Sequence, residues 1–289
     1  MDIGIGLPAT IPGTTGEQIV EWARTAEDSG FSSLGVIDRL VYGNAEPLVT
    51  LGAAAAVTSR IRLVTSILLV PFRANAALVA KQAATVNHLS GGRLTLGMAV
   101  GGYRDDYEVS GVPFTERGRR FDRMLAEMSE IWAGEPRGYA GAIGPTPGLD
   151  RSQILFGGMS GPTYTRVATW GTGWIAGSRG VETFQRGAEG VRQAWAEHGR
   201  EGTPRLLALP YFCLGPEAKP KAEAFLTDHY AVEGPATAAR LAAGALTDER
   251  MIRETIAAYE QAGCDELLLF PCSPDPQQVR LLAEAIAVR

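Results

Sequence analysis

Short apolar runs alternate with stretches of helical pattern along the whole chain. Runs such as Leu34–Ile37 and Leu94–Val100 have the length and aliphatic content of buried strands. From Phe121 to Trp132, apolar residues recur three and four positions apart, which predicts an amphipathic helix. Taken together, the pattern predicts strands at Ile3–Leu7, Leu34–Ile37, Ile61–Val70, Leu94–Val100, Ile154–Phe156, Gly173–Ala176, Leu206–Leu214 and Leu267–Phe270, each followed by a helical stretch.

The predicted strands are largely uncharged, so both of their faces need an apolar cover. This requirement is typical of a parallel sheet enclosed by helices. Eight successive strand–helix units close most simply into a (β/α)8 TIM barrel, for which about 250 residues is the usual length. We therefore expect an α/β protein in which residues 1–289 form one barrel domain. A doubly wound open sheet is the alternative.

Local signals predict where the first helix begins and where the chain departs from the strand–helix rhythm. Thr14 and Glu17 have the spacing of a capping box, and Gly30 would end the helix that they begin. Gly134–Asp150 is rich in glycine and proline and predicts an irregular connection. Ala231–Thr247 is an Ala- and Gly-rich excursion before the last strand. Because it follows a helix, we expect it to begin at the bottom of the barrel, away from the face that carries active sites.

Composition narrows the class of protein. The net charge is −5 and no block of Lys or Arg occurs, which argues against nucleic acid or an anionic membrane as the main partner. No apolar run approaches 18 residues and the start of the chain lacks a signal-peptide pattern, so we expect a cytoplasmic protein. Cys213, Cys264 and Cys272 form no C-x-x-C pair, which favours buried thiols over a zinc site or disulfides.

Several motifs are weak candidates for chemistry. Gly4–Ala9 imitates a dinucleotide fingerprint, but Pro8 interrupts it and the next helix begins too late for a Rossmann turn. The three histidines have no partner at helical spacing, so we expect no metal site. We interpret His88 and His198 as solvated, whereas His229 is kept as a candidate catalytic residue.

Residues just past the predicted strands are stronger candidates. Asp38 and Arg39 follow the second strand and could form a catalytic pair or a salt bridge at the rim. Gly101 and Gly102 follow the fourth strand, where paired glycines allow the backbone to approach a flat ring or a phosphate, or simply form a tight turn. After the fifth strand, the segment Gly157–Thr163 is a glycine-rich turn that enters a helix. Its free N–H groups and the hydroxyls of Ser160 and Thr163 predict an anion site there.

An ordered set of short motifs spans most of the chain. The motifs are Ala26–Phe31, Pro71–Arg73, Ala80–Thr85, Leu89–Arg93, Leu96–Gly97, Gly101–Gly102, Gly111, Leu155–Gly158 and Trp170–Trp174. No single motif is specific, but together, and in this order, they resemble the bacterial luciferase-like family of flavin-dependent oxidoreductases.

The resemblance implies a barrel that binds reduced FMN, as in the monooxygenases, or coenzyme F-420, as in hydride-transferring members. It places the isoalloxazine ring near the third and fourth strands, against Ser66 and Ile67, where the resemblance implies a bulge of the third strand with a non-prolyl cis peptide at the Ser66–Ile67 bond. The cofactor phosphate would lie at the turn after the fifth strand. The implied cofactor-binding residues are Ser66, Ile67, Gly101, Gly102, Gly157, Gly158, Met159, Ser160 and Trp174.

Two positions depart from the family pattern. Many members that use coenzyme F-420 have Asp-His where this chain has Asp38-Arg39, and luciferase itself has a phosphate-binding arginine where this chain has Val100. The cofactor choice stays open, with FMN slightly favoured. Because an arginine hardly ever loses its proton, we expect Arg39 to anchor substrate or cofactor rather than donate a proton.

The resemblance leaves the function with several alternatives. We expect a monooxygenase acting on a small, largely apolar substrate, with a separate flavin reductase as a partner and a homodimeric assembly. The apolar pocket is suggested by aromatic residues near strand ends, namely Tyr42, Tyr103, Trp174 and Phe212, which could equally belong to the core. The alternatives are a reductase or dehydrogenase that uses coenzyme F-420, a non-catalytic flavin-binding barrel, and an unrelated phosphosugar barrel.

Overall fold

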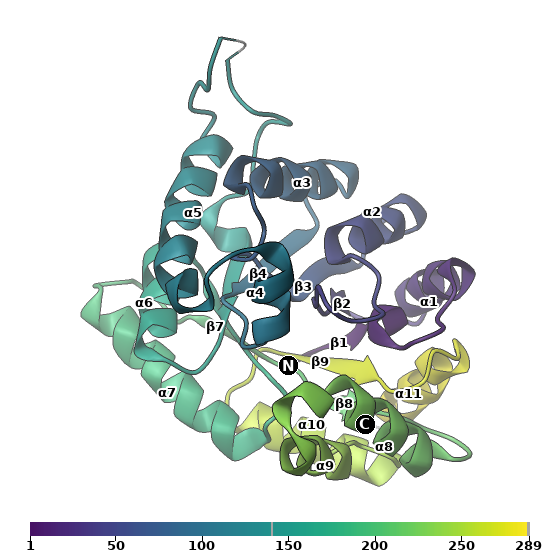
Figure 1. Ribbon diagram of the computed structural model, residues 1–289. Helices are drawn as coiled ribbons and strands as arrows, with labels where there is room; N and C mark the ends of the chain where they lie inside the picture. Colours follow the sequence, from purple (N-terminus) through teal and green to yellow (C-terminus); the bar gives the residue numbers. More distant parts are fainter. Residues whose placement is uncertain (140, 288–289) are drawn as a thin grey trace.

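A closed barrel of parallel strands forms the centre of the computed structural model, which describes residues 1–139 and 141–287 (Figure 1). The strands follow one another around the barrel in chain order, and β1 pairs with both β2 and β9, which closes the sheet. This confirms the predicted (β/α)8 barrel and rules out the open sheet. The strands are β1 (Asp2–Gly6), β2 (Ser33–Val36), β3 (Arg62–Leu69), β4 (Leu94–Ala99), β5 (Ile154–Gly157), β6 (Gly173–Ala176), β7 (Arg205–Ala208), β8 (Tyr211–Phe212) and β9 (Glu266–Pro271).

The segment predicted as one strand, Leu206–Leu214, is divided into β7 and β8. Both parts pair with β9 and together occupy one position in the barrel. The break falls at Leu209 and Pro210, where proline has no N–H to give to the ladder. Pro210 still accepts a hydrogen bond from the N–H of Phe270, so the strand direction continues across the break.

Side chains fill the interior of the barrel, and helices cover its outside, so most strand residues are buried. Every residue of β2, β4 and β9 is buried, as expected for strands covered on both sides. Phe270 occupies the centre, where Gly6 and Gly35 provide the space for its ring. A Cβ on Gly6 would lie 2.3 Å from the Phe270 ring, and one on Gly35 would lie 2.7 Å from it.

Helices cover the outside of the barrel. Their apolar faces pack on the strands in a continuous core that includes Trp22, Phe121 and Leu282. The helices are α1 (Gly16–Asp28), α2 (Pro47–Val57), α3 (Ala76–Leu89), α4 (Arg104–Ser110), α5 (Arg117–Trp132), α6 (Gly161–Trp170), α7 (Val181–Glu197), α8 (Ala218–His229), α9 (Pro235–Ala243), α10 (Glu249–Gln261) and α11 (Gln277–Ala287).

Helix α1 begins one residue later than the sequence predicts. The capping box consists of Thr15 and Gln18, whose side chains and backbone N–H groups bond reciprocally. Thr14 instead donates its hydroxyl to the carbonyl of Ile11 at 2.7 Å, which closes the preceding turn. The predicted box of Thr14 and Glu17 is therefore wrong by one position, because Thr14 is engaged before the helix starts.

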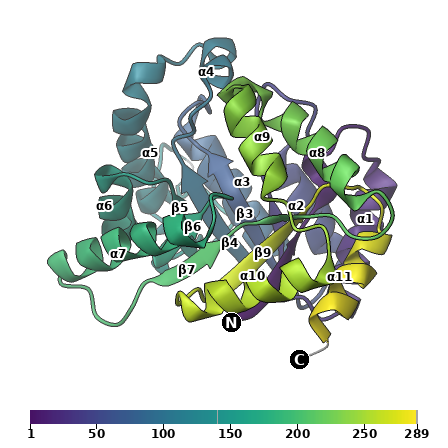
Figure 2. The same cartoon turned by 90° about the horizontal axis from the view of Figure 1, so that it is seen from below.

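The excursion at Ala231–Thr247 lies at the C-terminal mouth of the barrel, not at the bottom as predicted. Helix α8 runs toward the mouth, where Asp228 accepts a hydrogen bond of 2.6 Å from the Tyr42 hydroxyl in the loop after β2. Helix α9 then lies at the same end of the barrel as α4 (Figure 2). The helix that covers the outside of the barrel before β9 is α10, so α8 and α9 are free to cross the mouth. The predicted irregular connection Gly134–Asp150 includes residue 140, which lies outside the described residues; its described parts, 134–139 and 141–150, lie between α5 and β5 in the chain, as predicted.

Strand β3 contains the predicted irregularity but not the predicted cis bond. Its register with β4 shifts between Thr65 and Leu68, which is a bulge at Ser66 and Ile67. The cis peptide bonds of the described residues precede Pro145 and Pro147, so the Ser66–Ile67 bond is trans. The register shift alone accommodates the additional residue, since a bulge turns the backbone without requiring a cis peptide.

Glu27 connects α1 to the start of β3. Its carboxylate accepts hydrogen bonds from the backbone N–H groups of Ser59, Arg60 and Ile61, at 2.7 to 2.9 Å. Partial burial alone would raise the pKa of Glu27, but the N–H groups of Ile61, Arg60 and Ser59 outweigh it and lower that pKa from 4.5 to about 2. The ionised carboxylate therefore stabilises the folded state.

We expect the substitution Glu27→Gln to lower the free energy of unfolding by about 1 kcal/mol at pH 7, a value reduced by solvent screening. Because the folded pKa is depressed, the contribution is present above pH 4.5 and is lost as the pH falls toward about 2. Urea unfolding of both proteins at several pH values measures this. A difference that stays constant from pH 7 to pH 2.5 would contradict the assignment.

Candidate functional site

A cavity of about 600 Å³ opens at the C-terminal ends of β3 to β6, and we refer to it as the mouth cavity. Its walls come from the bulge of β3 and from the turns that follow β5 and β6. This is the face on which TIM-barrel enzymes build their active sites. The mouth cavity is lined by Ser66, Ile67, Ala99, Gly157, Gly158, Met159, Trp174, Ile175, Ala176, Gly177, Arg179, Thr183 and Leu209.

The β3 bulge presents one polar and one apolar group to the mouth cavity. The Ser66 hydroxyl is buried and has no hydrogen-bond partner. Ile67 packs against the backbone of β4 and β5, where glycine leaves room for it. A Cβ on Gly157 would lie 2.5 Å from Ile67 Cδ1. The bulge therefore offers a flat apolar contact beside an unused donor and acceptor, which suits a planar heterocycle.

The turn after β5 connects the mouth cavity to the N-terminus of α6. Gly158 has a φ of +119°, a backbone conformation that favours glycine. Ser160 is the N-cap of α6 but makes no capping hydrogen bond, and its hydroxyl instead lies 3.0 Å from that of Thr163. The first N–H groups of α6 thus lack a side-chain cap, an arrangement that suits an anion.

Trp174 holds this turn in place through a hydrogen bond. Its indole Nε1 donates a hydrogen bond of 2.8 Å to the carbonyl of Gly158, and its ring stacks on Phe184 at 5.9 Å between centroids. The side chain is fully buried. Trp174 therefore acts on the site through the position of Gly158.

Asp38 and Arg39 lie at the rim in ion pairs. The Asp38 carboxylate accepts hydrogen bonds of 2.8 Å from the N–H of Leu69 and from Arg73. Burial raises the pKa of Asp38, against the opposing effect of Arg73. Arg39 pairs with Asp105 at 3.0 Å in the segment after β4. These pairs tie together the loops after β2, β3 and β4.

Arg39 is further enclosed by the same segment. Its Nε lies 3.3 Å from Asp106, and its guanidinium lies 4.0 Å from the centroid of the Tyr103 ring. Asp106 also accepts hydrogen bonds from the N–H groups of Leu40 and Val41. Neither Asp38 nor Arg39 lines the mouth cavity. Both residues take part in ion pairs in this structure, and their catalytic role stays a prediction.

Glu233 joins the segment between α8 and α9 to two loops of the barrel. It accepts a hydrogen bond of 3.0 Å from the Tyr103 hydroxyl, after β4. It also forms an ion pair of 3.1 Å with Arg179, after β6. Burial, together with Tyr230 and Glu233, raises the pKa of Tyr103. The Tyr103 hydroxyl therefore stays protonated at neutral pH and remains a donor to Glu233.

His229 ends α8 in a cluster of aromatic rings. The imidazole stacks on Phe225 at 5.4 Å and meets the edge of Tyr42 at 4.9 Å. Its Nδ1 is buried without a hydrogen-bond partner. Burial and the nearby charge of Arg39 lower the pKa of His229 to about 4, so the imidazole is neutral at pH 7. His229 does not line the mouth cavity.

The structure brings together some, but not all, of the predicted cofactor-binding residues. Ser66, Ile67, Gly157, Gly158, Met159 and Trp174 line the mouth cavity, whereas Gly101, Gly102 and Ser160 lie outside its lining. Sequence reasoning missed Arg179 and Thr183. A signal was present, because Gly177-Ser178-Arg179-Gly180 is a polar turn directly after β6.

Two other features concern the described residues only. Within residues 1–139 and 141–287, no group of three His, Cys, Asp or Glu side chains is placed to hold a metal ion. In the same part of the chain, no helix combines the length and the apolar character needed to cross a membrane.

The three cysteines, Cys213, Cys264 and Cys272, are buried and unpaired, as predicted.

Comparison with known proteins identifies the family. The family described as luciferase-like monooxygenase matches residues 1–285. The chain belongs to this family. The resemblance carried by the glycine and tryptophan motifs is thereby confirmed.

Three known proteins are similar to this luciferase-like chain, two in sequence and one in fold. An uncharacterized protein of Mycobacterium tuberculosis is 33% identical over 173 residues, or 57% of this chain, and the chain spans only 61% of that relative's length. An F420-dependent glucose-6-phosphate dehydrogenase of Beutenbergia cavernae is 33% identical over 222 residues, 71% of this chain and 64% of that protein. A solved F420-dependent secondary alcohol dehydrogenase shares the fold, with a TM-score of 0.80 and 20% identity over 100% of this chain and 99% of that one.

Proposed function

We propose that this luciferase-like protein is an oxidoreductase that holds a reduced flavin-type cofactor in the mouth cavity. The observation that carries the proposal is the position of that cavity between the β3 bulge and the glycine turn that enters α6. Ile67 would hold the flat ring of the cofactor, and the turn Gly157–Ser160 would hold its phosphate. One cavity thus offers both a ring surface and an anion site at the right end of the barrel.

The residues present fit such a cofactor. The unpartnered Ser66 hydroxyl would bond a polar edge atom of the ring. Gly158, at its positive φ, lets the backbone of the turn approach the phosphate without a side chain in the way. Trp174 holds that turn through its carbonyl. These residues bind and orient the cofactor, while the apolar walls exclude water from its reactive face.

For the reaction, we propose monooxygenation with reduced FMN and oxygen on an organic substrate whose reacting part is apolar. Reduced FMN supplies the two electrons that activate oxygen. Ile67, Ala99, Met159 and Leu209 give the mouth cavity its largely apolar wall, against which such a substrate would pack. A separate flavin reductase would supply the reduced cofactor.

A second candidate is hydride transfer with coenzyme F-420. The observation that favours it is the 33% identity to an F420-dependent glucose-6-phosphate dehydrogenase. The ring site would be the same, and the substrate would then exchange a hydride with the cofactor and no oxygen would be consumed.

Anaerobic titration of the protein with each reduced cofactor, followed by addition of oxygen, separates the two candidates. We expect saturable binding of reduced FMN by absorbance, and oxygen uptake that yields an oxygenated product from an added substrate. Saturable binding of coenzyme F-420 alone, with hydride transfer, would replace the first proposal by the second. Binding of neither cofactor would overturn both.

The variant Ser66→Ala tests the ring site. Because one hydrogen bond contributes about 1 kcal/mol, we expect about fivefold weaker cofactor binding. Ser110→Ala is the matched control, since the Ser110 hydroxyl bonds its own helix at Tyr107 and lies outside the mouth cavity. Equal affinity of both variants would remove Ser66 from the site.

A further inference from the structure

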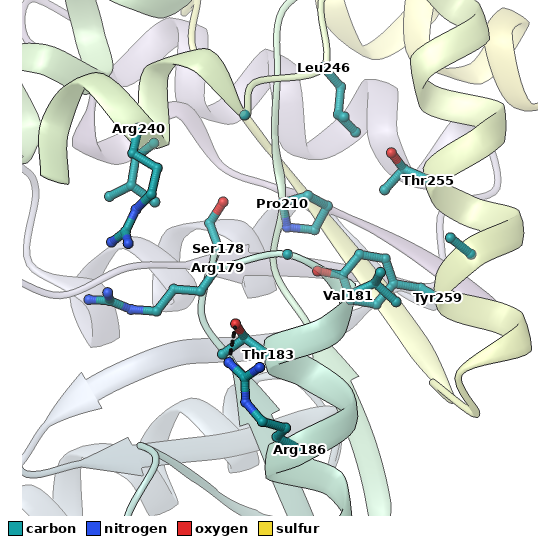
Figure 3. A pocket seen from close by; sticks show the side chains of 14 residues that line it. Ser178, Arg179, Val181, Thr183, Arg186, Pro210, Arg240, Leu246, Thr255 and Tyr259 are labelled. Carbon is teal, nitrogen blue, oxygen red and sulfur yellow. Dashed lines mark hydrogen bonds between the residues drawn. The ribbon is translucent and has the colours of Figure 1, made fainter. Parts of the chain in front are cut away.

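A second cavity of about 540 Å³ adjoins the mouth cavity, and we refer to it as the arginine cavity (Figure 3). It lies between the turn after β6, the N-terminal part of α7, and helices α9 and α10. Arg179 and Thr183 line both cavities. The two cavities therefore lie side by side and share part of their walls.

Three arginines line the arginine cavity. Figure 3 shows the guanidinium groups of Arg179 and Arg240 directed to the same side, from opposite walls. Arg186 lies further along α7 and donates a hydrogen bond of 3.2 Å to the Thr183 hydroxyl. The residues that line this cavity include no carboxylate. The cavity is thus strongly cationic in a chain whose net charge is −5.

The ion pairs of the described residues leave most of this charge unbalanced. Arg179 pairs with Glu233, which is itself shared with Tyr103. No described carboxylate lies within ion-pair distance of Arg186 or Arg240. Like charges that face one small space repel each other, and an anion between them relieves that repulsion. Guanidinium groups are also well shaped to bind the two oxygens of a carboxylate or phosphate.

We propose that the arginine cavity binds a carboxylate or phosphate group of the substrate, with Arg179, Arg186 and Arg240 as its cationic ligands. The proposal rests on the proposed function, because it assigns the reacting part of the same substrate to the mouth cavity. Apolar side chains beside the arginines, Leu241 and Leu246, would contact the carbon chain that joins the two ends. An acidic tail of the cofactor could supply the same kind of anionic group to the arginine cavity. The experiment distinguishes an anion of the substrate from an anion of the cofactor.

The test is calorimetric titration of the protein with inorganic phosphate at constant ionic strength, with FMN bound so that the turn after β5 is filled. We expect saturable phosphate binding by the wild type and about tenfold weaker binding by Arg240→Gln and by Arg186→Gln. Arg119→Gln is the matched control. Arg119 is exposed on α5 and lies outside the arginine cavity, so its substitution removes the same charge without changing the cavity lining. Its affinity is expected to stay within twofold.

Three outcomes would overturn the proposal. The first is no saturable phosphate binding, and the second is equal affinity of Arg240→Gln, Arg186→Gln and the control. The third is that phosphate binds when FMN is present but is excluded when coenzyme F-420 is present, since the tail of that cofactor then fills the cavity. If FMN itself fails to bind, the proposed monooxygenation with FMN fails. The same variants titrated without cofactor still show whether the arginines bind phosphate.

Discussion

The substitution Glu266→Gln is expected to lower the free energy of unfolding by about 3–5 kcal/mol, the usual effect of breaking a buried ion pair from one side. Glu266 is the first residue of β9 and is 0% exposed at the bottom of the barrel. Its carboxylate bonds the hydroxyls of Ser32 and Ser33 at 2.5 and 2.6 Å. It also pairs with Arg62 at 3.1 Å and with Arg205.

The neutral amide would leave Arg62 and Arg205 without their shared negative charge. Its NH2 group would also face the hydroxyl and guanidinium groups that donate hydrogen bonds to the carboxylate. Because Arg62 and Arg205 stand at the starts of β3 and β7, the loss affects three strands together. Equilibrium unfolding in urea measures the effect. The control is Glu254→Gln, whose carboxylate is exposed and paired with Arg250 one turn away, and there we expect less than about 0.5 kcal/mol. A loss below about 1 kcal/mol for Glu266→Gln would show that the network contributes little.

The substitution Gly158→Leu is expected to weaken cofactor binding at least about thirtyfold while the barrel stays folded. At φ +119° an L-residue is strained, and a Cβ would lie 2.9 Å from the Thr163 hydroxyl. The turn would have to move by a few tenths of an ångström or more, which misaligns the N–H groups at the start of α6. Backbone strain of this kind is of the order of 1–3 kcal/mol.

Gly161→Ala is the matched control for the same turn. Gly161 has no positive φ, and apart from its chain neighbours and the backbone of its own helix no described atom lies within 4 Å of the position of its Cβ. Its variant is expected to bind the cofactor within twofold of the wild type, by absorbance titration. A folded Gly158→Leu protein with wild-type affinity would exclude the turn as the phosphate site.

Much of the fold could be predicted because its determinants are local. Strand segments such as Leu94–Val100 are apolar at every position, and this follows from burial on both faces rather than from distant partners. The helix from Phe121 to Trp132 shows its buried face in the spacing of its apolar residues. The Gly157–Met159 part of the site could be found in the same way, since it directly follows a strand.

Other features were decided by contacts between segments far apart in the sequence. Arg39 is paired with residues more than sixty positions away, so no local pattern could distinguish a rim ion pair from a catalytic group. The bulge at Ser66 was expected, but its trans bond depends on how β3 and β4 pair. The capping of α1 differed by one position because Thr14 bonds the turn before it.

The sequence by itself determined the barrel, its order of strands and the glycine turn that is the candidate anion site, because periodicity and backbone freedom are properties of neighbouring residues. Only the tertiary structure decided that α8 and α9 lie at the mouth and that Arg240 and Arg179 line one cavity. The direction of a helix that leaves the outer layer depends on its contacts, here Asp228 with Tyr42 and Glu233 with Tyr103. Those contacts form only after the barrel has brought the ends of its strands together.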